Sequence, residues 1–168
     1  MKKRNQFRII DPWFVRPRVL LLEVLPESMQ TLAREIGQTP NQEAALRYAY
    51  DALGKKYRGY RILTALRLDC LFIHNLSTLW ERSGFLHCHH LNYLLRTLLV
   101  ASGKFQNDAI VAHWTQIWLF SPHQYLTVEL ADGRKVEVDP WGRVYGIPYG
   151  SHAHGFAGGT TFANIDTC

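Results

Sequence analysis

The sequence has little cysteine, and this limits the kinds of site it supports. Its three cysteines, Cys70, Cys88 and Cys168, form neither an even set nor a C-x-x-C pair. A disulfide framework needs paired cysteines, and a structural zinc site needs ligands in closely spaced pairs. We therefore expect free thiols.

Long apolar runs and cofactor motifs are also missing. The apolar run 19–22 is followed by Glu23 and Pro26 and is too short to cross a bilayer. The charged residues and prolines before it exclude the apolar core of a signal peptide. Neither a G-x-G-x-x-G motif nor a Walker loop occurs. We expect a soluble, cytoplasmic protein with no membrane partner and no organic cofactor.

Positive charge is in excess, with a formal net charge of +5 and a pI of about 9.2. The basic residues are dispersed, apart from a cluster at 2–4 and another at 55–61, and no recognition helix, zinc finger or RNP pattern accompanies them. We expect no specific nucleic-acid partner. The sequence leaves the oligomeric state open.

The length of 168 residues suits one hydrophobic core. We expect a lead-in with a short helix over 1–37, the core over 38–149, and a Gly- and His-rich, flexible tail over 150–168. A helix is predicted to begin at the run Thr39-Pro40-Asn41-Gln42 and to stop at Gly54, and another to be capped by Asn75. The segment 60–72 reads as either strand or helix.

The clearest helix begins at His87 or Cys88. It carries one apolar stripe, at spacings of three and four, and Gly103 is predicted to stop it; the stripe comprises Leu91, Leu94, Leu95, Leu98 and Leu99. A cysteine at a helix start faces unpaired backbone N–H groups and the positive end of the helix dipole, which favour the nucleophilic thiolate. Position alone leaves open whether Cys88 is a nucleophile or a small buried packing residue.

Three strands are predicted after this helix, over 113–120, 123–130 and 134–138, the last two joined by the turn sequence Ala131-Asp132-Gly133. Alternation places His123 and Asp139 together on the polar set of this hairpin, away from its apolar residues. A tight turn would set Asp139 opposite Thr127, too far from His123 for a hydrogen bond. A looser loop over 130–132 would set it opposite His123, and a triad requires this looser loop.

With that register, Asp139 orients the imidazole of His123, which takes the Cys88 proton as general base. Each residue has a plainer interpretation: His123 as a surface histidine after Pro122, and Asp139 as a turn residue before Pro140.

The joint order of a helix-opening Cys88, a strand-opening His123 and the run Val138-Asp139-Pro140-Trp141 resembles the core of the transglutaminase-like superfamily, within the papain-like cysteine protease fold group. The resemblance covers about 84–141. It implies an α+β fold in which the cysteine helix packs on an antiparallel sheet, and a Cys88–His123–Asp139 triad. The implied reaction is hydrolysis or acyl transfer at a peptide or glutamine-type amide through a thioester, with a protein or peptide as substrate.

Candidate oxyanion donors are the backbone N–H of Cys88 and the side chains of Gln116 and Trp80. Two alternatives stay open. The first is a metal site in the run 87–90 with His113, His152 and His154, although its spacing is wrong for zinc, so we predict no metal. The second is a transglutaminase-like fold that serves as a non-catalytic binding or scaffold module.

Overall fold

A computed structural model describes residues 25–60, 63, 66–68, 71, 73, 75–117, 121–155 and 161–162. Cys70, Cys168 and most of the segment 60–72, which the sequence left as strand or helix, lie outside the described residues. Among the described helices, none has the length and apolarity to cross a membrane. The described chain combines helices with a separate antiparallel sheet, as an α+β fold requires.

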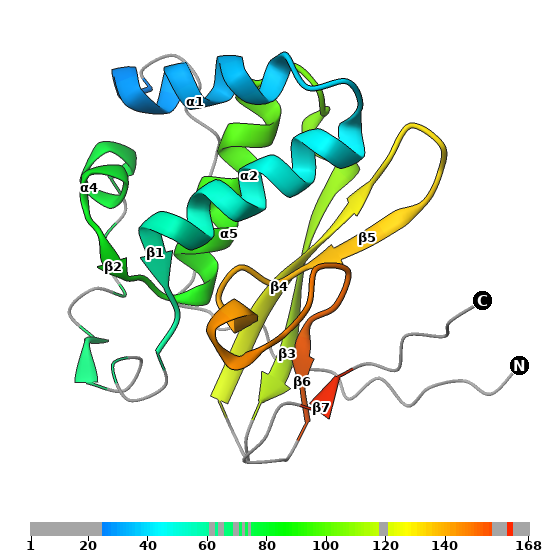
Figure 1. Cartoon of the computed structure of the whole chain (residues 1–168). Helices are drawn as coiled ribbons and strands as arrows, with labels where there is room; N and C mark the ends of the chain where they lie inside the picture. The colour runs from blue at the N-terminus through cyan, green and yellow to red at the C-terminus, as the bar shows by residue number, and fades with distance from the viewer. Residues whose placement is uncertain are drawn as a thin grey trace, which may run out of the picture.

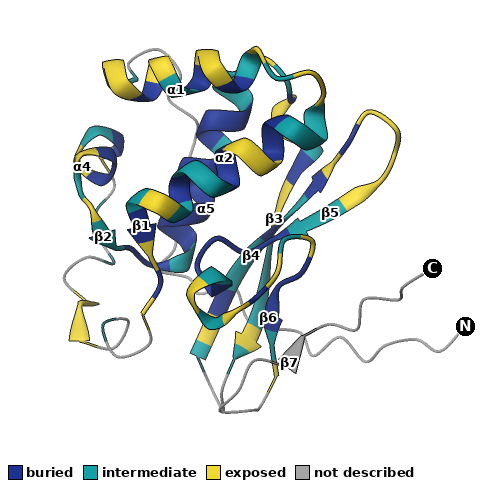
Figure 2. Ribbon diagram, in the orientation of Figure 1, coloured by how far each residue is buried: buried dark blue, intermediate teal, exposed yellow. Residues whose placement is uncertain are grey.

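Three helices form one layer above the sheet (Figure 1). They are α1 (Glu27–Gly37), α2 (Gln42–Lys56) and α5 (Cys88–Ala101). The central helix, α5, contacts both α1 and α2 on one side and the middle strand of the sheet on the other. Its residues are accordingly buried on almost every face (Figure 2). This position fixes its N-terminus, and therefore Cys88, relative to the sheet.

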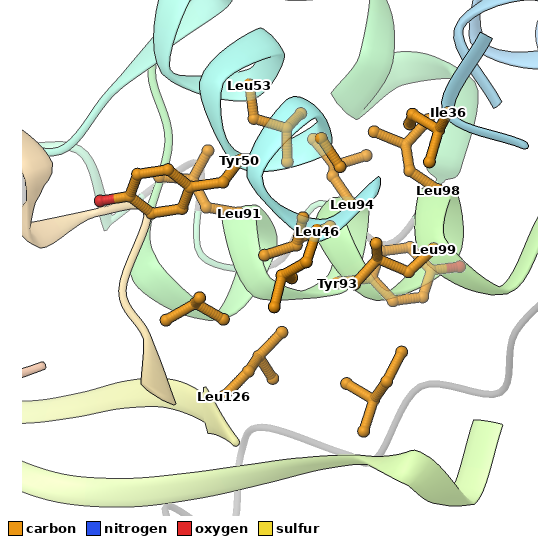
Figure 3. Close-up of a cluster of buried hydrophobic side chains, with 14 of the residues drawn as sticks. Ile36, Leu46, Tyr50, Leu53, Leu91, Tyr93, Leu94, Leu98, Leu99 and Leu126 are labelled. Atoms are coloured by element: carbon orange, nitrogen blue, oxygen red, sulfur yellow. The ribbon is translucent and has the colours of Figure 1, made fainter. Parts of the chain in front are cut away.

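The core fills the space between these layers (Figure 3). Leucines of α5 meet Leu46 and Leu53 of α2, Ile36 of α1 and Leu126 of the sheet. The predicted stripe is confirmed, because its five leucines are all buried. At about 1.5–3 kcal/mol per buried leucine, the stripe supplies a large share of the energy that seats α5.

The main sheet is an antiparallel meander of β3 (Ile110–Ile117), β4 (Ser121–Glu129) and β5 (Lys135–Val138). A short 3₁₀ turn, η2 (Asn107–Ala109), precedes it. Two smaller sheets are present: β1 (Tyr57–Arg58) pairs in parallel with β2 (Gly84–Phe85), and β6 (Ala153–His154) pairs with β7 (Thr161–Phe162). Two further elements of the described chain are the helix α4 (Leu76–Glu81) and the 3₁₀ turn η3 (Gly142–Tyr145).

Helix boundaries agree with the sequence in part. Asn75 caps α4 as predicted, through its side-chain oxygen and the Thr78 N–H at 3.0 Å. The start of α2 was predicted two residues early: Asn41 is the cap, and its side chain accepts from Ala44 N at 2.9 Å. Gly54 does not stop α2, which continues to Lys56. A side chain at Gly54 would collide with Arg143, so this glycine serves close packing.

The folded core extends beyond the limits expected for it. Met29 and Ile36 of α1 belong to the same core as α2 and α5, so α1 is an integral part of the domain. At the other end, Ser151, His152 and Ala153 are buried, and Gly155 bridges to Ile117 of β3. Residues 151–155 are therefore part of the fold, contrary to the expected boundary at residue 149.

Candidate active site

Cys88 is the first residue of α5, as predicted. The carbonyl of His87 accepts hydrogen bonds from His90 N and Leu91 N, both at 3.1 Å, which closes the first turn of the helix. Cys88 is a free, partly exposed thiol. Its place at the start of a 14-residue helix puts the sulfur at the positive end of the helix dipole.

The thiol also lies at the edge of β4. Gln124 N donates to Cys88 Sγ at 3.4 Å, and one turn along α5, Asn92 Nδ2 donates to Gln124 O at 2.7 Å. The N–H and C=O of Gln124 are on the side of β4 that faces β5. Leu130 bonds to Arg134 across this pair, and in an antiparallel ladder every second residue, here including Gln124, bonds toward the same neighbour. However, β5 has ended at Val138 before it reaches them. Cys88 and Asn92 thus take the place of a strand partner.

His123 and Asp139 form a buried pair. His123 Nε2 lies 2.7 Å from Asp139 Oδ2, and each residue is 1% exposed. Nε2 is engaged by Asp139, so Nδ1 is the ring nitrogen left for Cys88, whose hydrogen bonding and charge help to raise the pKa of His123. The structure therefore brings the three predicted residues together, in the order thiol, imidazole, carboxylate.

Two backbone N–H groups hold the Asp139 carboxylate in addition to His123. Gly142 N donates to Oδ1 at 2.9 Å, and Ala153 N donates to Oδ2 at 3.0 Å. A Cβ atom at Gly142 would lie 2.7 Å from Asp139 Oδ2, so only glycine fits at this point of η3. Asp139 is thus no ordinary turn residue: its orientation is fixed on several sides.

These contacts set the protonation states. Burial by itself lowers the pKa of His123, but the charge and hydrogen bond of Asp139, helped by those of Cys88, outweigh it and raise the pKa to about 10. Burial would raise the pKa of Asp139, but His123 and the two backbone donors outweigh burial and lower it. At neutral pH the pair is therefore imidazolium and carboxylate.

The expected registers of the hairpin were both wrong. Leu126 pairs with Val138, so if the strand continued, Asp139 would lie opposite Tyr125. This position is midway between the two predicted ones, Thr127 and His123. The turn has three residues and ends on Gly133, whose φ of +83° is left-handed. Asp139 still reaches His123 because it lies beyond the last residue of β5 and is not bound by the pleat of the strand.

The imidazole is also less exposed than its place on the polar set predicts. The apolar set is as expected, since Leu126 and Val128 are buried. On the opposite face, the ring of Trp141 lies 5.1 Å from the ring of His123. This face is covered near the site, and the cover withdraws the His123–Asp139 pair from water. Of the three residues, Cys88 is therefore the one that is partly exposed to solvent.

The two proposed side-chain oxyanion donors have different surroundings. Trp80 donates its indole N–H to Ser28 Oγ at 2.8 Å, so this N–H serves the packing of α4 against α1. Gln116 is exposed on β3 and pairs with Pro122, next to the His123 position. Trp80 is therefore a poor candidate, and Gln116 remains a prediction.

Within the described part of the chain, no group of three or more His, Cys, Asp or Glu residues is arranged to hold a metal ion. The rings of His87, His89 and His90 instead pack against one another, with the His89 and His90 centroids 4.0 Å apart.

Three residues that position the triad were missed: Asn92, Gly142 and Ala153. Asn92 had a signal in the sequence, because it lies one helical turn after Cys88 on the same face. The other two act through backbone N–H groups, for which side-chain identity gives no direct signal.

Comparisons with known proteins complete the description of the site. No protein-family model matches the chain, and neither the curated proteins nor the solved structures contain a significant match.

Proposed function

We propose that this protein is a cysteine-dependent hydrolase or acyltransferase with a transglutaminase-like core, acting on a peptide or glutamine-type amide. The observation that carries the proposal is the Asp139-bound imidazole of His123, whose remaining ring nitrogen faces a thiol at a helix N-terminus. Cys88 Sγ has three stabilising influences: the helix dipole, the Gln124 N–H and the His123 imidazolium.

The reaction that suits these groups has two balanced steps. Cys88 thiolate attacks the amide carbonyl, the C–N bond breaks, and His123 gives its proton to the departing amine. The product is a thioester on Cys88. Water, or a primary amine, then attacks the thioester and loses a proton to His123, which releases the acid or the new amide and restores the thiolate–imidazolium pair.

Asp139 has a positioning role in both steps. Its carboxylate holds Nε2–H of His123 and keeps Nδ1 directed at the thiol, while its negative charge stabilises the imidazolium. The Trp141 ring shields this ion pair from water, which strengthens the interaction.

The decisive experiment measures the rate of Cys88 alkylation by iodoacetamide from pH 4 to 9. Peptide mass spectrometry separates Cys88 from the other cysteines. In the wild type the alkylation rate should stay on a plateau well below the ordinary thiol pKa of about 8.5. In His123→Ala this plateau should be lost. Identical, unshifted profiles in both proteins would contradict the proposal and favour a non-catalytic binding module.

A second assay identifies the reaction. Glutamine-containing peptides are incubated with and without a primary amine, and the thioester on Cys88 is sought by mass spectrometry of the intact protein. Ammonia release without amine incorporation indicates a hydrolase, and amine incorporation indicates a transferase. Cys88→Ser, which replaces the sulfur by a weaker nucleophile, is the matched control.

A further inference from the structure

A second histidine–carboxylate pair lies on the sheet beside the triad. His152 Nδ1 is 2.7 Å from Glu137 Oε2, and the His152 ring stacks on Tyr125 with centroids 3.7 Å apart and planes within 3°. Glu137 lies on β5, two residues before Asp139, which follows the end of the strand. His152 is mostly buried there.

The residue after His152 touches the triad directly. Ala153 N donates to Asp139 Oδ2, the same oxygen that His123 Nε2 contacts. This N–H reaches the carboxylate only if residues 151–153 are held against the sheet. The side chain of Ala153 provides little anchorage, whereas His152 is attached both to β5, through Glu137, and to β4, through Tyr125.

We propose that His152 is a positioning residue of the triad: anchored by Glu137 and Tyr125, it holds the Ala153 N–H on Asp139 and so fixes the carboxylate that orients His123. This inference rests on the proposed function of the site. It adds to the triad a second support that the catalytic residues alone do not reveal.

The charges around His152 suit this role. Burial lowers the pKa of His152, and nearby His154 lowers it further, while Glu137 and the more distant Asp139 act in the opposite direction. His113 lies on the Tyr125 ring as well, with centroids 5.3 Å apart. The net lowering of the pKa keeps His152 neutral at neutral pH. Its Nδ1–H then donates to the Glu137 carboxylate without placing a second positive charge near His123.

The test is an NMR titration of the His123 imidazole in the full-length protein. In His152→Ala we expect the pKa of His123 to fall by about one unit, a tenfold shift toward neutral imidazole, because Asp139, no longer held by the Ala153 N–H, turns away from His123 Nε2 and weakens the pairing that raises this pKa. His152→Asn places an amide N–H near the position of Nδ1 and should return the pKa of His123 most of the way to its wild-type value. Glu129→Ala, which removes an exposed carboxylate elsewhere on the sheet, should leave the titration unchanged.

Glu137 provides a second route to the same answer if His152→Ala does not fold. Its side chain is about one-third exposed (36%), so truncation is tolerable. Glu137→Ala should lower the pKa of His123, and Glu137→Gln, which keeps an oxygen acceptor for His152, should lower it less. A residue that merely fills space would reduce the melting temperature without moving this titration.

The outcomes separate this inference from the proposed function. A raised pKa of His123 in the wild type that persists in His152→Ala and Glu137→Ala overturns the inference and leaves the triad intact. If His123 in the wild type titrates at the ordinary histidine pKa of about 6.5 and Cys88 is unreactive, the proposed triad is overturned, and the role of His152 with it.

Discussion

The backbone N–H of Gln124 points at the thiol of Cys88, with the nitrogen 3.4 Å from Sγ. In the register of the hairpin, Pro140 would lie opposite Gln124, and proline has no N–H to contribute to a ladder. The chain turns away after Val138, and α5 occupies the edge of β4 that β5 leaves free. One local event, the end of β5, therefore both exposes a donor to the thiolate and releases Asp139 to reach His123.

This arrangement predicts the effect of Asn92→Ala. The substitution leaves Gln124 O without its donor, which should lower the free energy of unfolding by about 1–3 kcal/mol. The change should also slow Cys88 alkylation several-fold at pH 6, because the edge of β4 no longer holds the first turn of α5. Urea denaturation and alkylation rates measure the two effects. Arg96→Ala, which removes an exposed contact from α5 to Asn107 at the start of η2, should affect neither strongly.

Gly142→Ala tests whether the carboxylate needs its close backbone support. The added methyl group would meet Asp139 Oδ2 and Ile147 Cγ1, each at 2.7 Å, and forcing it in should cost about 1–3 kcal/mol. We expect the pKa of His123 to fall and the alkylation plateau to weaken.

Gly133→Ala is the matched control for that substitution. Gly133 also has a special role, since its φ is +83°, but a methyl group there meets nothing within 4 Å. It should therefore destabilise the turn by about 1–2 kcal/mol and leave Cys88 reactivity unchanged. Equal losses of reactivity in the two variants would show that the Asp139 contact is not specific.

The His123–Asp139 pair also predicts how stability varies with pH. The pKa of Asp139 is lowered by folding, so its contribution is present above an unfolded pKa of 3.8 and is lost as the pH falls through the lower folded value. The pKa of His123 is raised from 6.5 to about 10, so its contribution is full below pH 6.5 and disappears as the pH rises toward 10.

The two contributions overlap between pH 4 and 6.5, taking the ordinary pKa values of about 3.9 and 6.5. Asp139→Ala should therefore cost most in this window, about 3–5 kcal/mol, and less at pH 10. Thermal or urea unfolding of both proteins at pH 5, 7, 9 and 10 measures the difference. A cost that is constant over this range would mean that His123 does not gain a proton on folding.

The three residues of the proposed triad were predicted to lie together, and they do, but the register of the hairpin that carries two of them was predicted wrongly. Cys88 was recognised by its place at the start of a helix with an apolar stripe, and that stripe is buried as predicted, although the other faces of α5 are largely buried as well. The His123–Asp139 pairing was reasoned from register, and both registers were wrong. Register depends on turn length, and Ala131-Asp132-Gly133 is compatible with several turns that differ little in energy.

Two other predictions, an exposed His123 and a flexible segment after residue 149, were wrong because segments distant along the chain cover or anchor these residues. Alternation places His123 on the polar set of β4, but it does not reveal that Trp141 covers that face. The Gly- and His-rich composition after residue 149 suggests a flexible tail, whereas His152 is anchored to Glu137 and Tyr125. Both features rest on pairings between residues distant along the chain, and composition and periodicity carry no information about such pairings.

Two variants, Gln116→Ala and Trp80→Phe, test which side chain donates to the oxyanion in the proposed mechanism. Alkylation of a thiolate by iodoacetamide forms no tetrahedral oxyanion, whereas attack on an amide does. If Gln116 is a donor, Gln116→Ala should slow amide turnover by about 10²–10³-fold and leave the alkylation rate unchanged. Trp80→Phe keeps the ring but removes the N–H bonded to Ser28, so it should lower stability by about 1 kcal/mol without changing either rate. Unaltered turnover in Gln116→Ala would leave the backbone N–H of Cys88 as the remaining candidate donor.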